Sequence, residues 1–219
     1  MQFDAVHTEG ISTIDSQDVA YAEELGYRIK HLGVTTETPA GIEIRVHPTL
    51  IPERRLIANV NGVMNAVLVQ SDAVGSTLYY GPGAGAEPTG SSVVADLVDV
   101  VRTFTTDPEN RVPHLAFQPD LLSDKPVLAS DQFECAFYLR LLAEDRAGVM
   151  ADVTRILAEQ QISIESLLQK DPIDDQNAVP VVLLTHRVKE ASMNTAIEKI
   201  EKLDSIRAPV ARIRVESLD

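Results

Sequence analysis

The stretch LRLLAEDRAGVMADVTRILAEQQISIESLLQ, residues 139–169, decides the fold of the second half of the chain. It opens with apolar and polar side chains in alternation, which is typical of a strand with one buried face. Apolar residues then recur at helical spacing, at Val149, Val153, Ile156 and Leu157. A second extended apolar segment follows at 162–169. The stretch therefore predicts a strand, a helix and a second strand in succession.

The same pattern repeats after this stretch. Residues 179–186 form another apolar, β-branched run. A helical stripe follows it, made of Met193, Ala196, Ile197, Ile200 and Leu203. Residues 211–215 alternate again and predict a last strand. The order βαββαβ predicts a ferredoxin-like sandwich, in which one antiparallel sheet carries both helices on the same face.

The turn between the first strand and the first helix of this module is a candidate binding site. It contains Asp145 and Gly148, and the helix begins at Val149 and Met150. Free N–H groups at a helix start suit a ligand carboxylate. A purely structural turn is the alternative, because ferredoxin-like folds serve many functions.

A second candidate lies upstream in LYYGPGAGAEPTGSSVVADLVD, residues 78–99. Gly81, Gly83 and Gly85 leave the backbone open to a ligand, and an amphipathic helix follows. The start of that helix suits an anionic or electron-rich group. The spacing matches neither a P-loop nor the dinucleotide fingerprint G-x-G-x-x-G. A structural glycine turn is therefore the alternative to a ligand contact.

The part of the chain before the glycine stretch is predicted to contain a helix and several strands. Asp15 is the expected N-cap of a helix that ends at Gly26, and strands are expected at 27–34 and 42–47. Residues 63–69 are nearly all apolar, which predicts a strand covered on both faces. Several polar side chains here could suggest catalysis, but their spacing fits neither a metal site nor a catalytic triad. These residues are Glu9, Lys30, His31, Glu43 and His47.

The glycine stretch resembles the C-terminal half of bacterial homoserine dehydrogenases. Four upstream pieces carry the same resemblance: TEGI (8–11), ELGYRIKHLG (24–33), RVHPTLIP (45–52) and NVNGVMNAV (59–67). Residues 139–169 are similar to the ACT family of small amino-acid-binding regulatory modules, which dimerise through strands. The expected fold is thus α+β (α/β), with a partial homoserine dehydrogenase substrate domain, a mixed sheet with helices, before the ACT domain. The expected boundaries are 1–105 for the catalytic and dimerisation part, 106–134 for a linker and 135–219 for the ACT domain.

The resemblance implies an oxidoreductase that interconverts homoserine and aspartate 4-semialdehyde with NAD or NADP, in threonine and methionine biosynthesis. In this family the Rossmann domain, the catalytic Lys and the substrate carboxylates precede the point that matches residue 1. We therefore expect no catalytic residue in this sequence and no activity from it alone. Gly81, Gly83 and Gly85 are expected to approach the nicotinamide cofactor. The alternative is a stand-alone amino-acid-sensing regulatory or dimerisation protein.

For the ACT module the resemblance implies allosteric feedback regulation. Asp145, Gly148, Val149 and Met150 are the expected effector-binding residues, with threonine as the suggested effector. The family also implies a homo-oligomer, formed through the ACT and dimerisation domains.

The amino-acid composition limits which partners the protein is expected to bind and in which cell compartment it is expected to work. A net charge of −14 over 219 residues disfavours nucleic acid and anionic membranes as partners. Cys135 is the single cysteine, so an internal disulfide is excluded and a reducing cytoplasm is the expected location. No apolar run reaches membrane-spanning length, and no metal site is expected.

Overall fold

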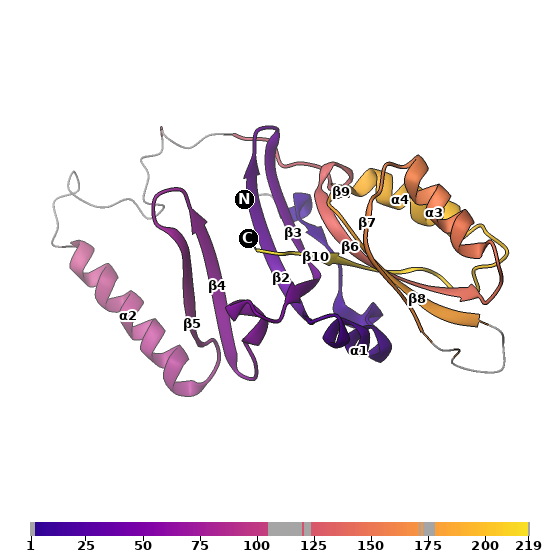
Figure 1. Ribbon diagram of the computed structural model, residues 1–219. Helices are drawn as coiled ribbons and strands as arrows, with labels where there is room; N and C mark the ends of the chain where they lie inside the picture. Colours follow the sequence, from indigo (N-terminus) through magenta and orange to yellow (C-terminus); the bar gives the residue numbers. More distant parts are fainter. Residues whose placement is uncertain (1–2, 105–119, 121–123, 171, 173–177, 219) are drawn as a thin grey trace. The chain divides into compact units, whose positions relative to one another are not determined.

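The computed structural model describes residues 3–104, 120, 124–170, 172 and 178–218. These residues form two compact units (Figure 1). The first unit consists of Met1–Ala58 with Lys125–Asp219, and the second consists of Asn59–Asp124. No helix in the described ranges is long and apolar enough to cross a membrane.

The second half of the first unit has the predicted ferredoxin-like fold. Its elements are β6 (Glu134–Glu144), α3 (Val149–Glu159), β7 (Ile164–Gln169), β8 (Ala178–Thr185), α4 (Glu190–Ile200) and β10 (Ala211–Val215). The strands follow the order β10-β6-β8-β7, and each neighbouring pair is antiparallel. A short strand, β9 (Val188–Lys189), pairs with the start of β6. The predicted order βαββαβ is therefore confirmed. Side-chain periodicity alone predicts each long element of this module.

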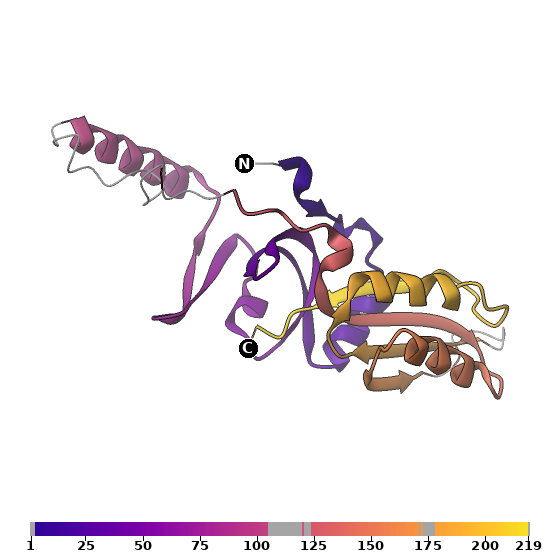
Figure 2. The same cartoon turned by 90° about the horizontal axis from the view of Figure 1, so that it is seen from above.

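Apolar side chains cover both faces of this sheet. Phe137, Leu139 and Leu141 of β6 pack with the buried faces of α3 and α4, which run along the sheet (Figure 2). The intervening Tyr138 points to the opposite face, where it packs with Ala22 and other apolar residues. Alternation along a strand thus supplies two cores from one element.

The beginning of the chain forms a helix and a long hairpin. Asp15 caps α1 (Ser16–Glu24) by accepting a hydrogen bond of 2.8 Å from the Gln17 N–H, and Asp18 completes a capping box. The strands β2 (Tyr27–Thr38) and β3 (Gly41–Pro52) pair along their whole length. Both extend beyond the predicted 27–34 and 42–47, because continuous cross-strand pairing overrides the polar residues at the turn.

The hairpin and the ferredoxin-like module share one eight-stranded sheet. β3 lies parallel to β10, with Arg214 opposite Thr49, and also parallel to β1 (His7–Thr8). Val127 forms a bridge to Ile42, and Leu128 packs against the core. The boundaries of the two compact units therefore differ from the expected domain boundaries, which are 1–105, 106–134 and 135–219. Those boundaries remain a prediction about sequence modules, and most of the expected linker lies outside the described residues.

The first unit also contains short helical turns. They are η1 (Phe3–Ala5), η2 (Ile11–Thr13), η3 (Leu56–Asn59) and η6 (Ser130–Gln132). The last residue of η3 is the first residue of the second unit.

The second unit contains a hairpin and a helix: β4 (Met64–Ser71), β5 (Gly75–Pro82) and α2 (Ala86–Phe104). The strand predicted at 63–69 is present, but the expectation that it is covered on both faces is wrong for this chain. Val67 and Val69 are 61% and 41% exposed, because the hairpin has only two strands. α2 also exposes its apolar residues, which are Val93, Val94, Leu97, Val98, Val100, Val101 and Phe104.

Candidate functional site

The glycine loop of the second unit connects β5 to α2. A Cβ at Gly83 would lie 2.1 Å from Nδ2 of Asn65, so the exposed Asn65 side chain would have to move to admit any other residue there. Gly85 has a φ of +134°, which disfavours any side chain. A Cβ at Gly81 would meet no described atom within 4 Å. Backbone conformation therefore explains Gly85, and the neighbouring Asn65 side chain favours glycine at position 83. Gly81 faces open space in which a ligand could approach the backbone.

The turn of the ferredoxin-like module brings its four predicted residues together at the start of α3. Gly148 is the N-cap, in the left-handed region at φ +96°, and a Cβ there would meet no described atom within 4 Å. Asp145 is exposed, while the Val149 side chain is buried in the core. Val149 could thus contribute only its backbone to a ligand, and the open side of the turn is formed by Asp145 and Gly148.

Two arginines flank this turn, and one of them could not be placed there from the sequence. Arg146 donates to Glu144 at 3.2 Å, and Arg207, distant in sequence, donates to the same carboxylate. Both guanidiniums are more than half exposed. They add positive charge beside a helix start, which favours an anionic group.

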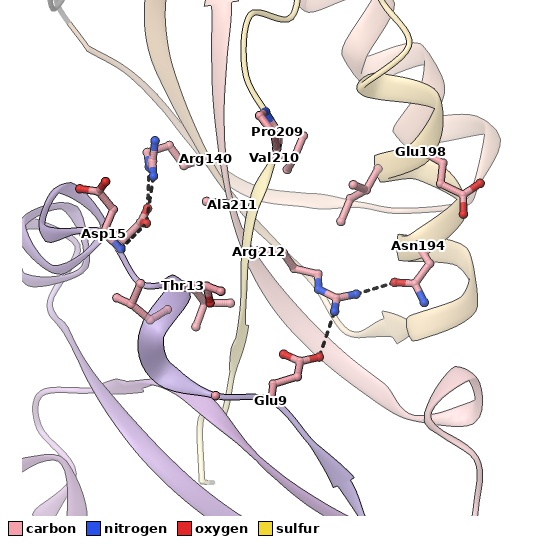
Figure 3. A pocket seen from close by; sticks show the side chains of 15 residues that line it. Glu9, Thr13, Asp15, Arg140, Asn194, Glu198, Pro209, Val210, Ala211 and Arg212 are labelled. Atoms are coloured by element: carbon pink, nitrogen blue, oxygen red, sulfur yellow. Dashed lines mark hydrogen bonds and ion pairs between the residues drawn. The ribbon is translucent and has the colours of Figure 1, made fainter.

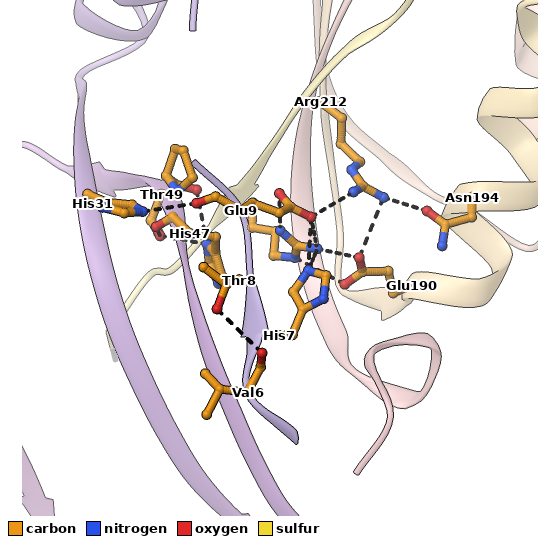
Figure 4. Close-up of polar contacts among 12 residues, drawn as sticks. Val6, His7, Thr8, Glu9, His31, His47, Thr49, Glu190, Asn194 and Arg212 are labelled. Carbon is orange, nitrogen blue, oxygen red and sulfur yellow. Dashed lines mark hydrogen bonds and ion pairs between the residues drawn. The ribbon is translucent and has the colours of Figure 1, made fainter. Parts of the chain in front are cut away.

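A second polar constellation lies where β10 meets the beginning of the chain. Arg214, only 1% exposed, donates two hydrogen bonds of 2.8 Å to Glu9 and one of 3.0 Å to Glu190, and its Nη2 also donates to the other carboxylate oxygen of Glu190. Figure 4 shows that Glu9, Glu190, His7 and Arg212 lie together in this constellation. Burial alone would raise the pKa of Glu9, but the hydrogen bonds and charge of Arg214 outweigh it and lower that pKa to about 2. Burial likewise opposes the charge on Arg214, yet both carboxylates hold its pKa above the usual range. Glu9 and Arg214 therefore form a buried ion pair that stays charged at neutral pH.

This network has the spacing of a metal site but already contains its own cation. Ligand atoms of His7, Glu9 and Glu190 lie within 4.8 Å of one another. The Arg214 guanidinium lies among them, and its Nη2 is 3.1 Å from Nε2 of His7. Because Arg214 supplies the positive charge, we assign no metal to the cluster.

The polar residues of the first half that the sequence analysis expected to be non-catalytic also take part in polar contacts within the structure. Nε2 of His31 is 3.0 Å from the Glu9 carbonyl oxygen, and Nδ1 of His47 is 3.0 Å from Oγ1 of Thr49. Arg45 donates to both Glu43 and Glu216, and all three side chains are nearly buried. Lys30 lies on β2.

An open groove of about 800 Å³ lies beside the network, between residues 9–18, β10 and α4 (Figure 3). Arg140 on one wall donates to Asp18 at 2.6 and 3.0 Å, and the Tyr138 hydroxyl donates to the same carboxylate at 2.9 Å. Hydrogen bonding to Asp18 raises the pKa of Arg140 despite partial burial. Arg212 on the facing wall donates to Glu9 at 3.1 Å and also to Asn194. No local sequence pattern indicates this groove, because its walls come from distant segments.

Comparison with known proteins identifies the family. The homoserine dehydrogenase family model matches residues 1–98, and the ACT domain model matches residues 137–205. The homoserine dehydrogenase of Pseudomonas aeruginosa is 63% identical over all 219 residues. The chain belongs to the homoserine dehydrogenase family. It corresponds to the C-terminal half of these enzymes and carries an ACT domain, so the stand-alone alternative is not favoured.

Other homoserine dehydrogenases are also similar to this chain along its whole length. The Neisseria gonorrhoeae homoserine dehydrogenase is 53% identical over 218 residues. The crystal structure of a homoserine dehydrogenase from Thiobacillus denitrificans is 59% identical and superposes with a TM-score of 0.92, covering 100% of this chain and 49% of that chain. The chain covers 50% of each of the Pseudomonas and Neisseria proteins. It thus spans about half the length of the curated relatives it matches.

Proposed function

We propose that this chain forms the C-terminal half of a homoserine dehydrogenase, an oxidoreductase that interconverts homoserine and aspartate 4-semialdehyde with NAD or NADP. The identity of 63% along the entire chain carries this proposal. We extend it to a cytoplasmic enzyme of threonine and methionine biosynthesis that works as a homo-oligomer. Within it, the ACT domain senses an amino acid.

In this proposal the glycine loop belongs to the cofactor site. The nicotinamide cofactor supplies the hydride chemistry. The contribution of this chain is a backbone that can be approached closely, above all at Gly81, where a Cβ would enter open space. Gly83 and Gly85 hold the adjoining turn in shape. Together they would orient the cofactor rather than react with the substrate.

The exposed apolar residues of the second unit support an association role. α2 and the β4–β5 hairpin present many large apolar side chains to solvent, including Val101 at 63% and Phe104 at 75% exposure. Contiguous exposed apolar surface is typical of association sites. We propose that the nucleotide-binding half of the enzyme and a second copy of the chain cover this surface.

A chimeric enzyme tests the proposed function. The N-terminal half of the Pseudomonas aeruginosa relative, joined to this chain, is expected to oxidise homoserine with NAD or NADP at a rate close to that of the parent enzyme. This chain alone is expected to show no turnover, because hydride transfer requires cofactor, base and substrate clamps together. A folded chimera without activity would refute the proposal, and turnover by the chain alone would refute the expected location of the active site.

Two glycine variants of the chimera test the cofactor site, one within the glycine loop and one as a control outside it. Gly81→Val is expected to raise the KM for the cofactor about tenfold, because the new side chain fills space required by the ligand. Gly90→Ala in α2, where a Cβ also meets no described atom within 4 Å, is expected to leave the KM unchanged. Equal behaviour of the two variants would remove Gly81 from the site.

We propose that the turn before α3 is the effector site and that threonine is its ligand. The ligand carboxylate would meet the N–H groups of Gly148, Val149 and Met150, and its ammonium group would meet Asp145. Asp145→Asn is expected to weaken threonine binding by about tenfold, the effect of losing one charged hydrogen bond. Because Asp145 is exposed, the melting temperature without ligand should stay the same. A thermal-shift titration of the 219-residue chain with threonine, and with lysine as control, measures both quantities.

Two results of this titration would contradict the assignment. A threonine shift no larger than the lysine shift would exclude threonine as the effector. Equal threonine shifts in the parent chain and in Asp145→Asn would place its binding elsewhere.

A further inference from the structure

One face of the β4–β5 hairpin has an open position next to the glycine loop. Asn65 of β4 lies directly opposite Gly81 of β5. The next pair on the same face is Val67 with Tyr79, because opposed residues and alternate residues project from the same side of a sheet. Gly81 has no side chain, and a Cβ there would meet no described atom within 4 Å. The face therefore has a gap at Gly81, with Asn65 on the neighbouring strand and Tyr79 on the same strand.

The side-chain amide of Asn65 is held against the glycine loop. A Cβ at Gly83 would lie 2.1 Å from Nδ2 and 3.3 Å from Oδ1 of Asn65. Nδ2 donates to the carbonyl oxygen of Val63 at 3.3 Å, and the Gly83 N–H donates to the same oxygen at 3.3 Å. The amide of Asn65 and the backbone of Gly83 thus share one acceptor, which fixes an exposed side chain beside the loop.

This amide retains hydrogen-bonding groups for another molecule. An asparagine side chain has two N–H donors and an acceptor oxygen. The contact with Val63 uses one donor, so within the described part of the chain Oδ1 and the second N–H of Asn65 remain. A primary amide on a ligand has the same two kinds of group and can both donate to Asn65 and accept from it. A carboxylate or phosphate accepts only, so Asn65 suits a ligand amide better than an anion.

Apolar surface continues the same face. Val67 is 61% exposed, and the ring of Tyr79 is part of a side chain that is 66% exposed. A flat heteroaromatic ring that covered these side chains would remove apolar area from water and would meet an aromatic neighbour. The open position at Gly81 therefore adjoins an amide on one side and an aromatic side chain on the other. A flat ring that carries a primary amide matches both.

We propose that Asn65 binds the carboxamide of the nicotinamide cofactor, with the nicotinamide ring at Gly81 and beside Tyr79. This inference rests on the proposed function, which assigns the cofactor to the glycine loop, and it adds the side chain that recognises the ring. Asn65 binds and orients the ring and takes no part in the transfer of hydride. Fixing the carboxamide restricts how the ring can rotate, and such orientation is a requirement for transfer between bound molecules.

Calorimetric titration of the chimera with the Pseudomonas aeruginosa N-terminal half, without substrate, tests the proposal through binding alone. The probes are NAD or NADP, whichever the parent chimera binds more tightly, and its 3-acetylpyridine analogue, in which a methyl group replaces the amide nitrogen. Asn65→Ala is expected to weaken binding of the natural cofactor about tenfold and of the analogue no more than about threefold, because the analogue lacks the N–H that Oδ1 accepts. Gln70→Ala, which removes an amide from the opposite face of β4, is expected to change neither dissociation constant.

The preference for the natural cofactor over its analogue separates a direct contact from an effect on the loop. A distorted loop would weaken both dinucleotides alike, so equal losses in Asn65→Ala would overturn this inference. Unchanged binding of the natural cofactor in Asn65→Ala, or the same loss in Gln70→Ala, would also overturn it. In these three cases the parent chimera still binds the cofactor and the proposed function stands. Failure of a folded parent chimera to bind either NAD or NADP would overturn both.

Discussion

Replacing Arg214 by Leu is expected to lower the free energy of unfolding by about 3–5 kcal/mol, the cost of removing one partner from a buried ion pair. The substitution removes the guanidinium that is hydrogen-bonded to Glu190, which is only 2% exposed, and leaves that carboxylate with Arg212 at 3.5 Å. Glu9 loses two hydrogen bonds of 2.8 Å in the same step. Urea denaturation followed by far-UV circular dichroism measures the change in the first unit.

A surface arginine provides the matched control for this prediction. Arg155 on α3 is 65% exposed and pairs with Asp152 at 2.6 Å. Arg155→Leu is expected to cost no more than about 1 kcal/mol, because exposed ion pairs contribute little. If Arg214→Leu were as mild as this control, the network would be a minor contributor to stability.

Acidification from pH 6.5 to pH 4 is expected to remove roughly 3 kcal/mol of stability through His47 alone. Burial lowers the pKa of His47 from 6.5 to about 4, and the nearby charges of Arg214 and Arg45 act in the same direction. The unfolded chain thus binds this proton at a higher pH than the folded chain. The contribution is complete above pH 6.5 and is lost as the pH falls toward 4.

The position of His47 explains why the folded protein resists its protonation. The ring is fully buried, and its Nε2 has no hydrogen-bond partner among the described residues. The pKa of Glu9 falls from 4.5 to about 2, so Glu9 affects stability only below about pH 4.5. The range between pH 6.5 and pH 4.5 therefore separates the effect of His47 from that of Glu9.

Denaturation curves at a series of pH values measure this effect. His47→Gln is expected to flatten the dependence of unfolding free energy on pH between 6.5 and 4.5, because glutamine does not titrate. His186→Gln, which alters an exposed histidine, is expected to keep the slope of the parent. An unchanged slope in His47→Gln would exclude His47 as its source.

The sequence by itself determined the elements whose signals are local. The βαββαβ order followed from side-chain periodicity, because a buried face repeats at every second residue in a strand and at every third or fourth in a helix. The cap at Asp15 and the helix start at Gly148 also depend on neighbouring residues only. The family resemblance likewise rests on short contiguous motifs, so the order of residues along the chain is enough to indicate it.

Only the tertiary structure decided which distant segments meet. Glu9 and Arg214 are 205 positions apart, and no local pattern couples them. The same holds for Asp18 with Tyr138 and Arg140, and for the groove that these contacts border. The pairing of β3 with β10 contributes to this arrangement, because it joins a strand near the beginning of the chain to the last strand. Such pairing depends on complementarity across the whole sheet, which periodicity within one strand cannot specify.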